Sequence, residues 1–217
     1  MKRSLILGTI VWVVSCLYSF NTYATHYKTG YITYTRDQAE NPNPRKIHYE
    51  FILFTNDDSD VEDPQVIINM GDGNSITVQR QGSEIPIGNR ISKAIYKWEY
   101  TFGADGTYTV SWLGINRNNY ILNIAQPSQD IAMYISSKIK LNSLSDVNSS
   151  PHFLAPMPIF AKIGKRLEYN LLAHDADGDS IAYRLITPLT RTGGLPESVP
   201  GYTLPHQTFN CSNETAT

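Results

Sequence analysis

Short β-type segments separated by turn residues run through most of this sequence, and they constrain its fold more than any other feature. Val, Ile, Thr, Tyr and Phe are concentrated in short runs, most of which end at Gly, Pro, Asn or Asp. Before residue 145 the predicted strands are residues 31–35, 48–54, 65–70, 75–80, 94–102, 108–113, 120–125 and 131–141. No window shows a long apolar stripe at helical spacing with capping residues. The pattern predicts an all-β protein built as an antiparallel sandwich.

The segment from Asp105 to Trp112 predicts a strand together with the corner that precedes it. Tyr108, Val110 and Trp112 alternate with other residues and should therefore share one face of a strand. Asp105-Gly106-Thr107-Tyr108 is typical of a tyrosine corner, in which the tyrosine hydroxyl ties down a loop at the edge of a sandwich.

The N-terminal residues predict export. Met1-Lys2-Arg3 is a basic start, an apolar run from Leu5 to Leu17 follows, and Thr22-Tyr23-Ala24 supplies small residues for cleavage after Ala24. The apolar run is short for a membrane span, so residues 1–24 are predicted to be a signal peptide. The mature protein is then expected to be secreted, extracellular or on the outer cell surface. A competing interpretation is a lipoprotein anchored through Cys16, but the Ala24 site favours ordinary signal cleavage.

Composition limits both the stabilising chemistry and the partners of the mature chain. Without residues 1–24, Cys211 is the only cysteine, so an intramolecular disulfide is excluded and the domain depends on its hydrophobic core. The same cut removes two of the 18 basic residues and none of the 20 acidic ones, which changes the net charge from −2 to −4. This mild acidity without a basic cluster argues against nucleic acid and anionic membranes as partners.

A domain boundary is predicted at residues 146–151. Asp146–Pro151 is small, polar and ends in proline, as inter-domain linkers do. Residues 25–145 precede it as one sandwich domain, and strands are predicted to resume at residues 167–172 and 181–186. Residues 152–217 are fewer than the roughly 100 of a typical sandwich of this kind. We therefore expect an incomplete second domain with a flexible tail, within a chain that is part of a longer protein.

Two stretches of the first domain resemble the PKD domain, a small immunoglobulin-like sandwich. Ile67-Ile-Asn-Met-Gly71-Asp72-Gly73 is similar to the family's strand ending in a G-D-G turn, and Tyr100–Ser111 is similar to its Y-x-x-x-G-T-Y-T-V run. The chain departs from the family in having Met70 near the position of a large aromatic residue, and in the long acidic insertion at residues 56–63. The resemblance implies an immunoglobulin-like or PKD sandwich for residues 25–145.

The second part resembles cadherin-like modules of bacterial surface proteins. Asp146–Phe153 is similar to the inter-domain linker of that family without its middle acidic residue, and Leu172–Tyr183 is similar to its A-x-D-x-D-G-D-x-L-x-Y signature. Thr25-His26 followed by Gly30–Tyr34 resembles the mature start of large exported proteins of gliding bacteria, which often carry a gliding motility-associated C-terminal domain. These resemblances imply an adhesin-like or gliding-associated surface protein.

Asp175, Asp177 and Asp179 are the sharpest candidate site. Three carboxylates at alternate positions of a turn supply the hard oxygen ligands that Ca²⁺ prefers, and without a cation their charges repel one another. Ser180 and Ile186 stand where an EF-hand needs Gly and Glu, so the loop is not an EF-hand. The alternative is a solvated acidic turn between strands.

Two residues of the linker extend the calcium hypothesis. Asp146 and Asn148 are candidates to complete the metal site, in which case the bound cation would stiffen the two domains relative to each other. Against this stands a flexible hinge, because the linker is poor in ligands. The acidic run at residues 56–63 is interpreted as a solvated loop, with a second weak cation site as its alternative.

The sequence lacks the motifs of catalysis. The five histidines are scattered, and there is no H-E-x-x-H, no G-x-S-x-G and no glycine-rich phosphate loop. We therefore predict a protein that is not an enzyme and has no catalytic residues or organic cofactor. The function hypothesis is a non-catalytic exported spacer or binding module, whose partners are other domains of a longer surface protein or a surface glycan or protein. The alternative is a carbohydrate- or protein-binding accessory module of a secreted degradative enzyme, which aromatic side chains lined up on one sandwich face would favour.

Overall fold

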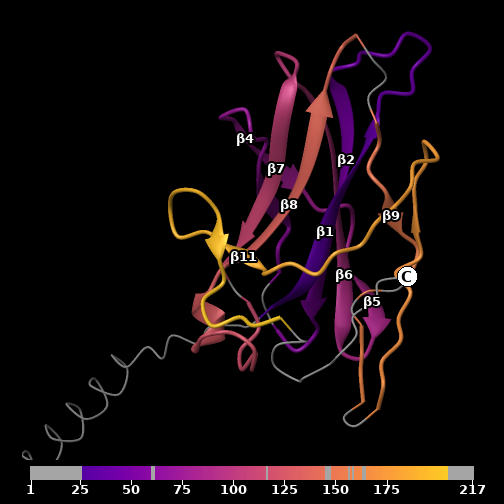
Figure 1. The fold of residues 1–217 in the computed structure, drawn as a ribbon. Helices are drawn as coiled ribbons and strands as arrows, with labels where there is room; N and C mark the ends of the chain where they lie inside the picture. The colour runs from indigo at the N-terminus through magenta and orange to yellow at the C-terminus, as the bar shows by residue number, and fades with distance from the viewer. Residues whose placement is uncertain are drawn as a thin grey trace, which may run out of the picture.

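The computed structural model describes residues 26–59, 62–115, 117–144, 148–155, 157, 159–162 and 165–204. The predicted signal peptide, Asp146 and both cysteines lie outside these ranges. Two antiparallel four-stranded sheets pack face to face, and the remaining chain runs over their outside (Figure 1). The described residues contain no α-helix, only the single 3₁₀ turn Ser128–Asp130. The all-β sandwich predicted from the strand pattern is confirmed.

The strand order is that of an immunoglobulin-type sandwich. One sheet has the order β1-β2-β6-β5 and the other the order β4-β3-β7-β8. The bounds are β1 Tyr27–Arg36, β2 Lys46–Asn56, β3 Gln65–Asn69, β4 Ser75–Gln79, β5 Ile85–Gly88, β6 Ile91–Thr101, β7 Gly106–Gly114 and β8 Met133–Leu141. If the strands are lettered A, B, C, C′, D, E, F and G along the chain, the sheets read ABED and C′CFG, the immunoglobulin arrangement with one added strand.

Alternate residues of the central strands fill the space between the sheets. Phe51 of β2 is fully buried, and its ring lies 5.7 Å from that of Tyr96 on β6 and 5.2 Å from that of Trp112 on β7. Val110 and Trp112 are both buried and Tyr108 packs against the same core, so the predicted shared face of β7 is confirmed. Burying one such side chain contributes about 1.5–3 kcal/mol to folding.

The predicted tyrosine corner is present at the start of β7. The Tyr108 hydroxyl donates a hydrogen bond to the Ala104 carbonyl oxygen at 2.8 Å, four residues upstream. The adjacent Asp105 carboxylate accepts bonds from the backbone N–H and the hydroxyl of Ser143, and pairs with Arg45. These contacts, led by the Ser143 N–H, lower the pKa of Asp105 to about 2. The corner therefore ties the β6–β7 loop to the chain that follows β8.

The G-D-G turn after β3 depends on its first glycine. Gly71 has φ of +82°, and a Cβ atom there would lie 2.7 Å from the backbone N and O of Thr109. Gly71→Ala is expected to lower the free energy of unfolding by roughly 2 kcal/mol, because left-handed strain adds to a backbone clash. Gly73→Ala is the matched control, since Gly73 also has positive φ but open space around it. Urea denaturation measures the free energy of unfolding of both variants. Equal decreases for Gly71→Ala and Gly73→Ala would contradict this account of the turn.

The strand predicted at residues 120–125 is wrong, and one edge strand of the first domain was not predicted. Residues 120–125 form a loop and not a strand, since Tyr120 has φ of +56° and the buried Ser128 hydroxyl accepts the Ile121 N–H at 3.1 Å. Tertiary hydrogen bonds thus override the β-propensity of this segment. The sequence did not predict β5, whose exposed residues include Pro86 and which pairs with β6 at the edge of its sheet.

The chain after residue 148 forms two short ladders. β9 (His152–Phe153) pairs with β10 (Ala173–His174), and β11 (Leu189–Thr190) pairs with β12 (Glu197–Ser198). The strands predicted at 167–172 and 181–186 are wrong, because no described residue of either range lies in a strand. Ala155 and Val199 are the buried apolar residues of the described part from 148 to 204. With so little core of its own, this part shows no second sandwich among its described residues, and the domain boundary at 146–151 stays a prediction.

These later residues lie against the first sandwich. The Ala125 N–H donates to the Pro200 carbonyl oxygen at 2.8 Å, and the Asn123 side chain bonds to Thr203. On the outer face of the first sheet, Ile52, Phe54 and Ile91 form a buried cluster against which Met157 packs. The segment after β9 therefore covers apolar surface that a free sandwich would expose to water.

Candidate functional site

The acidic turn at residues 175–179 is closed by its own first carboxylate. Oδ1 of Asp175 accepts the backbone N–H of Asp177 at 2.9 Å and that of Asp179 at 3.2 Å. Gly178 has φ of +83°, which lets the chain reverse at that point. The sequence therefore forms a turn here as expected, and the turn directly follows β10.

Asp177 joins this turn to the linker and to the first strand. Its Oδ2 accepts the Ser149 backbone N–H at 2.6 Å, and its Oδ1 lies 3.4 Å from Nη2 of Arg36 at the end of β1. The Asp177 side chain is only 18% exposed. Because this hydrogen bond has an ionised acceptor in a partly buried place, it is stronger than a neutral one.

The adjacent Ser150 is fixed to β1 as well. The Tyr34 N–H donates to the Ser150 hydroxyl at 2.7 Å, and the Ser150 N–H donates to the Tyr34 carbonyl oxygen at 2.9 Å. Burial, followed by the negative charges of Asp175 and Asp177, raises the pKa of the Tyr34 hydroxyl. The acidic turn, the end of the linker and β1 thus meet at one place on the edge of the sandwich.

The predicted calcium ligands are only partly brought together. Asp175 and Asp177 lie at this junction, the exposed Asn148 directly precedes Ser149, and Asp146 lies outside the described residues. Within the ranges that the structure describes, no group of three or more His, Cys, Asp or Glu side chains is arranged to hold a metal ion. Calcium binding by Asp175, Asp177, Asp179, Asp146 and Asn148 stays a prediction.

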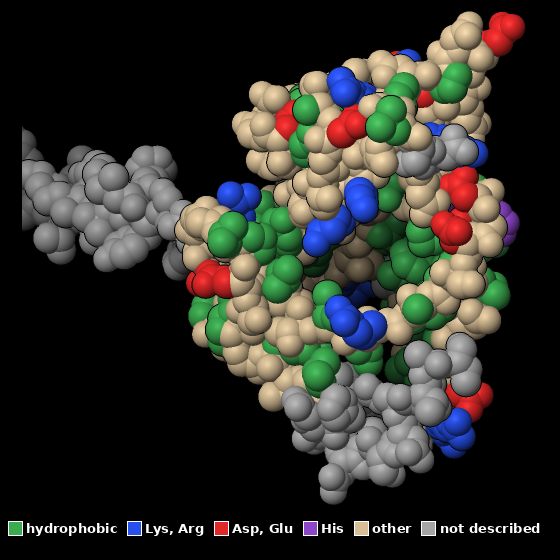
Figure 2. All heavy atoms as spheres, turned by 45° about the horizontal axis from the view of Figure 1, so that its top comes forward, with side chains coloured by type: hydrophobic (Ala, Val, Ile, Leu, Met, Phe, Trp, Pro, Cys, Tyr) green, Lys and Arg blue, Asp and Glu red, His purple; other side chains and the backbone are tan. Residues whose placement is uncertain are grey.

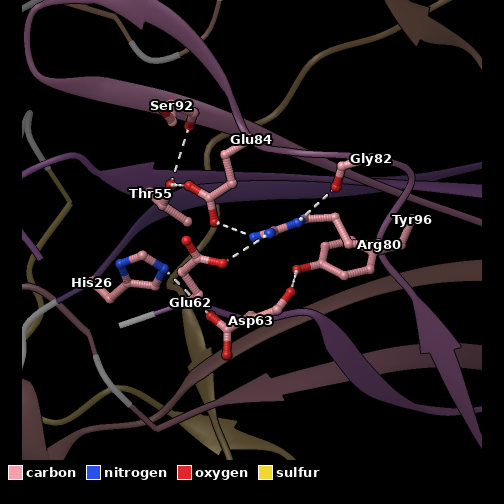
Figure 3. A network of polar contacts seen from close by, with 9 residues as sticks. All are labelled: His26, Thr55, Glu62, Asp63, Arg80, Gly82, Glu84, Ser92 and Tyr96. Atoms are coloured by element: carbon pink, nitrogen blue, oxygen red, sulfur yellow. Dashed lines mark hydrogen bonds and ion pairs between the residues drawn. The ribbon is translucent and has the colours of Figure 1, made fainter. Parts of the chain in front are cut away.

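The acidic run after β2 takes part in a polar network at the other end of the sandwich (Figure 3). Arg80 lies between two carboxylates, with Nη1 2.9 Å from Glu84 and Nη2 3.1 Å from Glu62. The Thr55 hydroxyl donates to Oε2 of Glu84 at 2.7 Å. Glu62 of this run is therefore paired with Arg80 of the β4–β5 loop, a contact that the interpretation of the run as a solvated loop did not predict.

His26 is a buried titratable group of this network. It is 2% exposed, and its Nε2 lies 3.4 Å from Oδ2 of Asp63, while the Tyr96 hydroxyl donates to the Asp63 carbonyl oxygen at 2.8 Å. Burial lowers the pKa of His26, and the nearby Asp63 charge opposes this effect. No sequence motif pointed to this network, because its members come from separate segments of the chain.

An aromatic groove lies between the first sheet and the segment that covers it. Its volume is about 590 Å³, and its lining includes Tyr31, Phe54, Phe153, Phe160 and Tyr169 together with Lys93. The rings of Tyr31 and Phe153 meet edge to face at 5.2 Å. Figure 2 shows acidic and basic side chains interspersed with apolar ones on one face of the molecule, which is hollowed near its centre.

The strand order of the two sheets defines the fold class of the protein as a β-sandwich of the immunoglobulin type. Comparison of the chain with protein-family models, with curated proteins and with solved structures finds no match. The described residues contain no helix that is long and apolar enough to span a bilayer.

Proposed function

We propose that the chain is a non-catalytic exported cell-surface module, adhesin-like or gliding-associated, that spaces or displays neighbouring domains. The observation that carries the proposal is the Asp177 junction, where the chain that leaves the sandwich is bound to the acidic turn through the Ser149 N–H and to β1 through the Ser150 N–H. A spacer module must hold the neighbouring domains in a fixed orientation. A connection of this kind serves that purpose, because a free linker would let the neighbouring domains rotate relative to the sandwich.

Calcium is proposed to stiffen the same junction. Melting of the mature protein is expected to occur several degrees higher in millimolar Ca²⁺ than in chelator, since a ligand that binds only the folded state stabilises it. Replacing Asp175, Asp177 and Asp179 together with Asn is expected to abolish this shift, whereas Asp57→Asn, at an exposed acid in the other acidic run, should preserve it. An unchanged melting temperature in Ca²⁺ would refute the metal site.

Export is tested on the cells that produce the protein. The N-terminal sequence of the exported form is expected to begin at Thr25, and external protease should degrade the protein on intact cells. A form that begins at Cys16 with attached lipid would support the lipoprotein interpretation instead. A protein that stays in the cytoplasm with residues 1–24 still attached would overturn the proposal.

The aromatic groove favours a second candidate function, that of a carbohydrate- or protein-binding accessory module. Aromatic rings supply apolar area with a polar edge, as sugar-binding surfaces need. A glycan-array screen of the mature protein tests it, with Phe160→Ala as the variant because this groove residue is exposed. Glycan binding by the wild type that is at least tenfold weaker in the variant would support the second function. If no glycan on the array binds, the protein is not a carbohydrate-binding module.

A further inference from the structure

Two histidines face each other across the short β9–β10 ladder. His152 and His174 are direct partners in the antiparallel pairing, and their ring centroids lie 6.0 Å apart with the planes tilted by 40°. His174 is exposed and His152 is half-buried. Successive side chains of a strand point to opposite sides, and Phe153 packs on Tyr31 of the first sheet. The histidine pair therefore lies on the opposite side of the ladder from Phe153, and His152 lines a hollow that it shares with Thr33 and His48 of the first sheet.

The separation of the two rings suits a shared metal ion. A zinc–imidazole bond is about 2.0–2.1 Å long and the ring centre lies roughly 1.1 Å further on, so two imidazoles on one tetrahedral ion have centroids about 5 Å apart. The two ring centroids lie 6.0 Å apart, so the rings need to approach each other by only about 1 Å to share an ion. Small changes of the two side-chain torsions would bring one nitrogen of each ring onto a common ion.

We propose that His152 and His174 form a two-histidine site for a divalent transition-metal ion such as Zn²⁺. The described residues offer no cluster of three or more metal-ligating side chains, so water completes the coordination. Imidazole suits zinc, nickel and copper, whereas the carboxylates of the acidic turn suit calcium, and the two predicted sites therefore differ in the ions they select. Neither site requires the other.

A metal ion at this position would act as a clamp on the covering segment. Each strand of the ladder has only two residues, yet the ladder joins the two ends of the segment 154–172, whose described residues Met157 and Phe160 line the groove on the outer face of the first sheet. A bond through the ion would join both ends of this loop. We expect Zn²⁺ to slow limited proteolysis within residues 154–172 and to leave cleavage elsewhere unchanged.

Titration calorimetry of the mature protein with Zn²⁺ tests the site. One equivalent is expected to bind, and His152→Asn and His174→Asn should each weaken binding at least tenfold. His48→Asn is the discriminating variant, because the 41% exposed His48 side chain lines the same hollow as His152. With His174 as the second ligand, this variant should bind zinc as the wild type does. The variant with Asn at Asp175, Asp177 and Asp179 should also retain zinc binding, which separates this site from the calcium hypothesis. No binding at millimolar Zn²⁺, or full binding by the double histidine variant, would overturn the proposal.

A measurement on the unmodified protein covers the case in which a variant fails to fold. The ring ¹⁵N signals of His152 and His174 are expected to shift together as one equivalent of Zn²⁺ is added. A shift confined to one of the two rings, or found only at His48, would overturn the shared site.

Discussion

Replacing Arg80 with alanine is expected to lower the free energy of unfolding by about 3 kcal/mol, because it leaves a partly buried carboxylate without its partner. The Arg80 side chain is 10% exposed and that of its partner Glu84 is 19% exposed. The Arg80 Nε also donates to the Gly82 carbonyl oxygen at 3.1 Å, so the variant loses the bond that shapes the β4–β5 loop. Urea denaturation followed by tryptophan fluorescence measures the loss.

Arg90 provides the matched control for this experiment. It also pairs with an acidic residue, Asp58, but its side chain is 75% exposed. Exposed ion pairs contribute about 0–1 kcal/mol, so Arg90→Ala should change stability little. Equal losses for the two arginine variants would show that the Arg80 network does not behave as a buried one.

Phe51→Ala is expected to have a still larger effect, about 3–5 kcal/mol, as other buried phenylalanine truncations do. Phe51 is fully buried between both sheets and contacts the rings of Tyr96 and Trp112. The vacated volume lies in the middle of the sandwich, where β2 is held on both sides by β1 and β6 and cannot collapse into it. A loss of this size is a large fraction of the stability of a typical domain.

Ile67→Ala serves as the control for Phe51→Ala. Ile67 lies on β3 with 67% of its surface exposed, so truncation should cost less than about 1 kcal/mol. Thermal and urea denaturation of both variants should place the whole difference in the midpoint and not in the slope. A loss below 1 kcal/mol for Phe51→Ala would mean that the core is not packed as described.

The sequence predicted those parts of the sandwich that depend on the pattern of neighbouring residues along the chain. The alternation of Tyr108, Val110 and Trp112 predicted the buried face of β7, and the residues before Tyr108 predicted the corner that its hydroxyl closes. Residues 131–141 were correctly assigned to a strand, now β8. In these segments, periodicity and turn chemistry agree with the tertiary structure.

The remaining features depend on contacts between distant segments, which a single sequence does not reveal. The Arg80 network joins residues of the β2–β3 and β4–β5 loops, and His152 meets His174 only after the chain reverses. Strand propensity at residues 167–172 and 181–186 failed because these residues have no neighbouring strand to pair with among the described residues. The sequence proposed that Asp146 and Asn148 approach the acidic turn. The contact that the structure shows runs through the Ser149 backbone N–H, which no side-chain pattern encodes.

Hydrogen exchange at the Ser149 and Ser150 amides tests most directly the claim that the acidic turn binds the linker to the sandwich. In the wild type, both amides should exchange slowly, since one donates to Asp177 and the other to the Tyr34 carbonyl oxygen. In Asp177→Ala, exchange at Ser149 should accelerate at least tenfold, because a hydrogen bond to a charged group is worth about 1.5–3 kcal/mol. The amides of β2 and β6 should be unaffected. Fast exchange of both serine amides in the wild type would contradict the account and show that the linker is free.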